Sequence, residues 1–172
     1  MSAIPHPPGL KLYPHLLSSQ EVGEILAQFE LHKQSPTNPQ LFRLFGNFEL
    51  SSAQPLPQWM MGWGQRMVEQ GIFSQCPDQY RLCDWMGEFS GNFNWHTDNN
   101  RHGEKILAIA LSDARVIGFR SKKRTKSIYR LPLNQGDAYL MAGAARWHWE
   151  HRVMPVGMQG SGGRSFIMSY KG

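Results

Sequence analysis

The chain has 172 residues, a formal net charge of +5 and a hydrophobic fraction of 41%. This length is that of one domain with a full core, and the apolar content excludes an intrinsically disordered chain. The two cysteines, Cys76 and Cys83, are too few for a disulfide scaffold, and no apolar run is long enough to span a bilayer. We expect a soluble, intracellular protein of the cytoplasm, and the positive charge favours a polyanionic partner such as nucleic acid.

Helical signals come first along the chain. Residues 18–29 begin with Ser18, a typical N-cap, and continue with apolar residues at helical spacing. The alternating residues 42–50 predict a hairpin or a covering loop. A second helix is predicted over residues 58–70, and Gly71 would end it. The first part of the chain is therefore mainly helical.

Short strands separated by turn residues follow, and helices before many short strands predict an α+β fold. We expect a double-stranded β-helix, or jelly roll, backed by the N-terminal helices. Residues 1–172 would form a single domain, with helical support and a lid region in 1–79 and the jelly-roll core in 80–172. The predicted strands are Tyr80–Met86, Phe93–His96, Ile106–Leu111, Val116–Arg120, Ser127–Leu133, Ala138–Ala142, Trp147–Val153 and Ser165–Tyr170.

Three residues in two separate segments are typical metal ligands. His96 and Asp98 lie two positions apart at the end of a predicted strand, so both side chains would project to one face. His151 lies in a later strand. Two imidazoles and one carboxylate leave open positions on an octahedral ion, the arrangement that suits iron(II) oxygenases. We predict an iron(II) site at His96, Asp98 and His151, and manganese or nickel would accept the same ligands.

His148 is a competing ligand candidate in the same segment as His151. Alternation along a strand puts His148 and His151 on opposite faces, so only one of the two can face the metal. The alternative interpretation is that His96 and His151 are ordinary core or capped histidines, because a His-x-Asp pair alone is a weak signal.

Arg164, at the start of the last predicted strand, is a candidate binding residue for an acidic cosubstrate. A cosubstrate with two carboxylates needs a fixed cation deep in the barrel, and arginine pairs bidentately with a carboxylate. The alternative is an exposed arginine after the turn at Gly162 and Gly163.

Taken together, these segments resemble the AlkB family of iron(II)/2-oxoglutarate dioxygenases. The resemblance covers most of the chain and is strongest from Tyr80 to Tyr170. The residues that carry it are His96-x-Asp98, Leu131-Pro132-Leu133 with Gly136-Asp137, His148-Trp149-x-His151 with Pro155, and Arg164. It implies a jelly-roll core, iron(II) as cofactor and 2-oxoglutarate as cosubstrate. It also implies oxidative dealkylation, commonly of methylated nucleic-acid bases, with release of formaldehyde.

The resemblance also implies which positions contact 2-oxoglutarate. The family's Leu-x-Asn-x-Tyr pattern reads here as Leu82-x-Asp84-x-Met86, and the second arginine of the last strand is replaced by Tyr170. The cosubstrate residues carried over are therefore Arg164, Tyr170 and Asp84. An ionised Asp84 would repel a carboxylate, and Met86 offers no hydroxyl donor.

A basic segment and one aromatic residue are candidates for substrate contact. Lys122, Lys123 and Arg124 are too highly charged to pack inside and predict a solvated hairpin tip that could follow a phosphate backbone. Trp95 precedes the first histidine and could lie near the iron. The alternative for the tip is an ordinary soluble loop. Two other functions stay open: hydroxylation of a protein or small metabolite, and nucleic-acid binding without catalysis.

Overall fold

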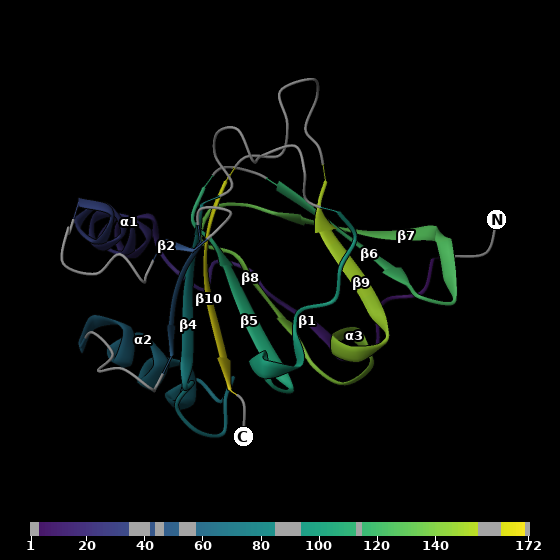
Figure 1. The fold of residues 1–172 in the computed structure, drawn as a ribbon, viewed down its shortest axis with the longest axis horizontal. Helices are drawn as coiled ribbons and strands as arrows, with labels where there is room; N and C mark the ends of the chain where they lie inside the picture. Colours follow the sequence, from purple (N-terminus) through teal and green to yellow (C-terminus); the bar gives the residue numbers. More distant parts are fainter. Residues whose placement is uncertain are drawn as a thin grey trace.

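Two antiparallel sheets face each other in the computed structural model, which describes residues 4–34, 42–43, 47–51, 58–84, 94–112, 115–154 and 163–170 (Figure 1). The described strands are β1 (Leu10–Tyr13), β2 (Phe42–Arg43), β3 (Asn47–Ser51), β4 (Gln79–Asp84), β5 (Lys105–Ala110), β6 (Arg115–Ser121), β7 (Arg124–Leu133), β8 (Ala138–Met141), β9 (Trp149–Val153) and β10 (Arg164–Tyr170). The larger sheet has the order β1-β8-β5-β10-β4-β3-β2, and the smaller sheet has the order β7-β6-β9. This arrangement confirms the predicted jelly roll.

The larger sheet separates two apolar clusters. Phe166 and Met168 of β10 contact residues of the two long helices on one face of this sheet. Ile167, between them, packs on the opposite face against the cluster that fills the space between the sheets. Successive strand residues point to opposite faces, so each residue of β4, β5 and β10 belongs to one of these two environments. That division decides which side chains can reach a site between the sheets.

The helices α1 (Ser19–Gln34) and α2 (Gln58–Glu69) lie on the outer side of the larger sheet (Figure 1). Val22 and Ile25 of α1 and Met60 and Met67 of α2 are fully buried against it. Apolar residues at helical spacing therefore form the buried faces, as the sequence predicts. Among the described residues, no helix is long and apolar enough to cross a bilayer.

A capping box starts α1. The backbone N–H of Glu21 donates to Ser18 Oγ at 3.3 Å, and the Glu21 carboxylate accepts from the Ser18 backbone N–H at 2.7 Å. Arg66 of α2 also pairs with Glu21, which connects the two helices. The predicted helix start at Ser18 is confirmed.

Replacing Ser18 with alanine removes this cap. We expect the free energy of unfolding to fall by about 1 kcal/mol, because one helical N–H loses its acceptor. Urea denaturation followed by circular dichroism measures the change. Ser19→Ala is the matched control, because Ser19 is exposed in the first turn of the helix. Equal effects of the two substitutions would show that the cap does not stabilise the fold.

Three predicted strands differ from the structure by more than one residue. The expected strand Ser127–Leu133 begins earlier, at Arg124. The expected strand Trp147–Val153 begins later, at Trp149, because Gly143–Trp147 forms the short helix α3. The expected strand Phe93–His96 is a loop over its described residues, joined to β9 by a single bridge between His96 and His151. Small residues before Trp147 permit the helical turn, which directs Arg146 into the protein rather than along a strand.

Candidate metal centre

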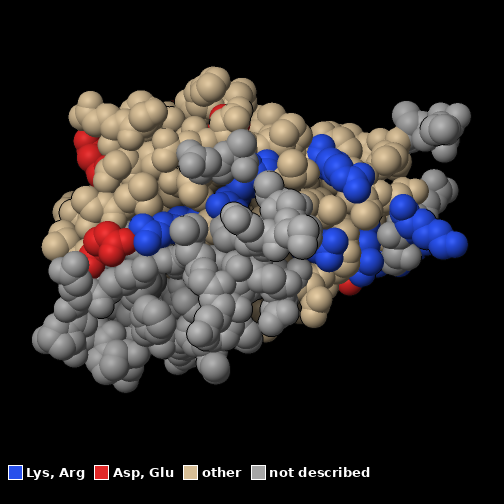
Figure 2. All heavy atoms as spheres, turned by 90° about the horizontal axis from the view of Figure 1, so that it is seen from above, with Lys and Arg blue, Asp and Glu red and all other residues tan. Residues whose placement is uncertain are grey.

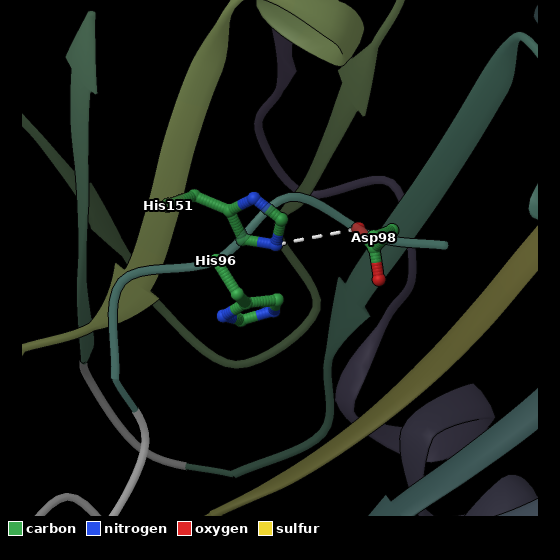
Figure 3. Close-up of side chains that lie close together, drawn as sticks. All are labelled: His96, Asp98 and His151. Atoms are coloured by element: carbon green, nitrogen blue, oxygen red, sulfur yellow. Dashed lines mark ion pairs between the residues drawn. The ribbon is translucent and has the colours of Figure 1, made fainter. Parts of the chain in front are cut away.

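His96, Asp98 and His151 converge between the two sheets (Figure 3). One ligand atom from each residue lies within 4.8 Å of the other two, and Asp98 Oδ2 is 3.4 Å from His151 Nε2. Neighbouring ligand atoms at about 2 Å from one ion lie about 3 Å apart, so the Asp98–His151 separation is already close to that of two ligands on one ion. The two nitrogens and one carboxylate are the donor set of an iron(II) centre with open positions. The residues fit the metal that the sequence predicts.

Backbone pairing brings the two histidines together across 55 positions of sequence. The N–H of His151 donates to the carbonyl of His96 at 2.9 Å, and the N–H of His96 donates to the carbonyl of His151 at 3.2 Å. His151 also pairs with Phe119 of β6 in the smaller sheet. The position of His151 is therefore set by the sheet, and His96 is attached to that sheet by the bridge.

The surroundings of both imidazole rings favour metal binding. The carbonyl of Asn94 lies 2.9 Å from His96 Nδ1 and can only accept, so this contact favours a proton on Nδ1, and Nε2 would then be the atom able to bind a metal. Burial lowers the pKa of His151 to about 4, against the opposing effect of Asp98, and this imidazole is neutral at pH 7. A neutral imidazole is the form that binds a metal.

Asp98 is paired with an arginine that the sequence analysis did not identify. Arg81 of β4 places Nη2 3.3 Å from Asp98 Oδ1, and both side chains are nearly buried, with exposed fractions of 12% and 10%. Burial alone would raise the pKa of the Asp98 carboxyl, but the Coulomb interactions with His151 and Arg81 outweigh the effect of burial and hold that pKa well below its usual range. Because His151 is neutral at pH 7, Arg81 supplies the permanent positive charge, and Asp98 is ionised.

Arg146 of α3 holds the loop that carries Asp98. Its guanidinium donates to the carbonyls of Asp98 at 3.0 Å, Asn99 at 2.8 Å and Gly103 at 2.9 Å, and only 1% of the residue is exposed. The sequence contains a signal for this role, since an arginine interrupts an otherwise apolar stretch from residue 138 to 147. Lysine and arginine are almost never fully buried without partners.

A cavity of ≈ 200 Å³ surrounds the three candidate ligands. Most of its wall is apolar, with side chains from both sheets, so bulk water has restricted access to the ligand atoms. The lining residues are Arg81, His96, Thr97, Asp98, Asn99, His102, Ile106, Ala108, Ile117, Tyr139, Met141, His151, Val153 and Ile167.

Two of the three residues expected to bind the cosubstrate, Arg164 and Tyr170, are not among the described residues that line this cavity. Arg164 Nη1 instead pairs with Glu30 Oε1 of α1 at 2.8 Å. Tyr170 packs with the cluster beneath the helices. The physical reason is strand alternation, because both residues share the helix-facing side of β10 with Phe166. Asp84 ends β4 opposite Arg164, and its side chain lies outside the described part of the structure.

The candidate substrate residues lie on the outside of the smaller sheet. The Trp95 ring packs on Gly118 of β6, with the guanidinium carbons of Arg120 and Arg152 at 4.5 and 4.9 Å from its centroid. Gly118 and Arg152 are register partners. Arg152 directly follows His151, whose side chain faces the cavity, so Trp95 is on the opposite face and not beside the metal position.

The predicted hairpin tip connects β6 and β7. Lys122 and Lys123 are exposed there, and Lys122 Nζ donates to the carbonyl of Trp147 at 3.0 Å. Arg124 begins β7, and its side chain lies outside the described part. His148, the competing ligand, is exposed at the end of α3 and does not line the cavity.

A family model described as the 2OG-Fe(II) oxygenase superfamily matches residues 46–165. The chain belongs to this superfamily. The protein is thus an iron(II)- and 2-oxoglutarate-dependent dioxygenase, and iron(II) and 2-oxoglutarate are its cofactor and cosubstrate. A search of curated protein sequences finds no significant match.

Solved structures share the fold of this oxygenase at low sequence identity. OsALKBH1 has a TM-score of 0.58 and 14% identity, with 94% of this chain and 98% of that chain covered. A putative oxygenase from Shewanella oneidensis has a TM-score of 0.62 and 10% identity, with 94% and 80% covered. A Pseudomonas putida prolyl-4-hydroxylase has a TM-score of 0.57 and 14% identity, with 95% and 94% covered. Because such identities establish the fold alone, these similarities leave the substrate open.

Proposed function

We propose that this dioxygenase holds iron(II) with His96, Asp98 and His151 and oxidatively removes alkyl groups from a nucleic-acid base. The metal assignment is supported by the convergence of three ligand atoms in a mostly apolar cavity. The substrate class is supported by the basic outer face of the smaller sheet, together with the AlkB resemblance and the similarity to OsALKBH1.

The basic face is the observation that carries the choice of a nucleic acid. Arg130, Gly118 and Arg152 are register partners across β7, β6 and β9, so two arginines lie in one row on either side of a glycine. Seen from above, Lys and Arg side chains gather over the end of the molecule formed by this sheet (Figure 2). Positive side chains on one face of a protein attract polyanions, and a phosphate backbone is such a polyanion. The hairpin tip at 122–124 extends the same proposed surface.

When bound, iron(II) and 2-oxoglutarate supply the oxidation: dioxygen and 2-oxoglutarate yield succinate and carbon dioxide, and the substrate methyl group becomes a hydroxymethyl group that leaves as formaldehyde. The chain contributes the environment of this reaction. Asp98 stays ionised and His151 neutral, so no proton has to leave either ligand before the metal binds. The apolar side chains of Ile117, Val153 and Ile167 exclude water from the ligand atoms.

A panel of methylated DNA and RNA oligonucleotides tests the proposed reaction. We expect formaldehyde and succinate in equal amounts with at least one substrate, and neither product with the His96→Ala variant. Succinate without formaldehyde from any oligonucleotide, but with an oxidised peptide or metabolite, would instead support a hydroxylase. The prolyl-4-hydroxylase fold similarity makes that the second candidate. Oligonucleotide binding without succinate formation would support a non-catalytic binding protein.

A further inference from the structure

A cavity that binds 2-oxoglutarate needs a positively charged side chain, and the described lining of this cavity includes none from the last strand, β10. The Asp98 carboxyl group lines this cavity, and 2-oxoglutarate brings two more carboxylates into the same space. Like charges at short range in such a space repel strongly unless a positive group is present. Arg164 pairs with Glu30 on the helix-facing side of β10 and is not among the described residues that line the cavity.

Arg81 of β4 is the one lysine or arginine among the described residues that line the cavity. Its register partner on β10 is Ile167, which also lines the cavity, so this face of both strands points between the sheets. Only 12% of the Arg81 side chain is exposed. A nearly buried guanidinium beside a ligand-binding cavity is a strong binding group for a carboxylate.

The contact with Asp98 places Arg81 at the metal end of the cavity. Nη1 and Nη2 of Arg81 lie 3.4 and 3.3 Å from Asp98 Oδ1, while Asp98 Oδ2 faces His151. The two oxygens of one carboxylate therefore face different partners, with Oδ2 directed to the candidate metal position. The Arg81 guanidinium therefore lies next to the carboxylate that is proposed to hold the ion, and its five N–H donors can serve two carboxylates.

We propose that Arg81 binds the carboxylate of 2-oxoglutarate next to the 2-oxo group, in addition to holding Asp98. This assignment rests on the proposed iron site, and it moves the cosubstrate cation from the last strand, where the AlkB resemblance implies it, to the neighbouring strand β4. The AlkB family has an arginine at the position of Tyr170. In this proposal, Arg81 on the adjacent strand β4 of the same sheet takes over its role.

Binding measurements with the manganese(II)-loaded protein test this proposal without turnover. The Arg81→Gln variant retains an N–H donor for Asp98 but loses the charge, so we expect it to bind manganese(II) within about threefold of wild type. Its Kd for 2-oxoglutarate should rise about 10- to 100-fold, the loss expected for charge-assisted hydrogen bonds. Arg81→Lys should recover part of this loss because it restores the charge without the planar fork. Calorimetric titration gives both affinities, and circular dichroism confirms the fold.

The matched control is Arg164→Gln, which should change the Kd for 2-oxoglutarate by less than about threefold. A large loss with Arg164→Gln and none with Arg81→Gln would overturn the proposal. Loss of manganese(II) binding by folded Arg81→Gln would assign Arg81 to positioning Asp98 only. If wild type itself bound no manganese(II) or iron(II), the iron-site proposal would fail first, and this assignment would fail with it.

A 2-oxo acid without the second carboxylate identifies which end Arg81 binds. 2-Oxobutyrate keeps the carboxylate next to the 2-oxo group, so Arg81→Gln should weaken 2-oxobutyrate and 2-oxoglutarate by a similar factor. A loss confined to 2-oxoglutarate would show that Arg81 binds the distal carboxylate and would overturn the assignment made here.

Discussion

Replacing His151 with alanine should weaken manganese(II) binding at least about 100-fold and abolish succinate formation. Among the described residues, the imidazole is one of three side chains that converge at the proposed metal position, and it is neutral at pH 7 because burial lowers its pKa to about 4. Without it, the metal keeps His96 and Asp98 alone, and two ligands do not hold a first-row metal tightly. Calorimetry with manganese(II) and a succinate assay with iron(II) measure the two effects.

His148→Ala is the control for this prediction, since His148 lies three positions earlier and is exposed. We expect its metal affinity and its succinate formation to equal those of wild type. Comparing the two variants tells which of the two candidate ligands in this segment, His148 or His151, binds the metal. Equal metal affinity in His151→Ala and wild type would place the metal elsewhere and contradict the proposed site.

Replacing Arg146 with leucine should reduce the free energy of unfolding by about 3–5 kcal/mol. The substitution removes the donor to three backbone carbonyls, and an unsatisfied buried acceptor costs about 1–3 kcal/mol. The cation–π contact with Trp147, at 4.1 Å from guanidinium carbon to ring centroid, is lost as well. Two of the three carbonyls belong to Asp98 and Asn99, so the metal affinity of the folded fraction should also fall.

Arg130→Leu is the matched control for Arg146, because Arg130 is an exposed arginine on β7. We expect its stability to stay within about 0.5 kcal/mol of wild type. Chemical denaturation of both variants, followed by metal titration of the folded proteins, measures the two effects. Similar small changes in both variants would show that Arg146 does not organise the loop.

Local patterns in the sequence predict the elements of this protein well. Ser18 with Glu21 marks the start of α1, and apolar periodicity predicts α2 and the order of the strands from β4 to β10. These signals are local, because capping and alternation depend on residues only a few positions apart. The strand expected over 147–153 starts late because the buried partners of Arg146 are far away in sequence, at 98–103.

The three candidate ligands could also be chosen from the sequence, although for a partly different reason. His96 and Asp98 were expected to share one face of a strand, whereas the described residues around them form a loop with a single bridge. The residues converge because Arg146 holds the carbonyl of Asp98 while β9 holds His96. Residue types and order thus indicate the metal chemistry, and tertiary contacts produce the geometry.

Which face of each strand meets the cavity was decided by the tertiary structure. Both faces of the larger sheet are covered, by helices on one side and by the smaller sheet on the other, so apolar alternation does not distinguish them. A shift of one residue moves every side chain of a strand to the other face. Residue types, their order and the AlkB resemblance predict an iron(II) and 2-oxoglutarate oxygenase with His96, Asp98 and His151 as candidate ligands. Only the pairing of β4 with β10 placed Arg81 in the cavity and Arg164 outside it. Alternation tells which residues share a face of a strand, and the assembled sheets decide which of the two faces meets the cavity.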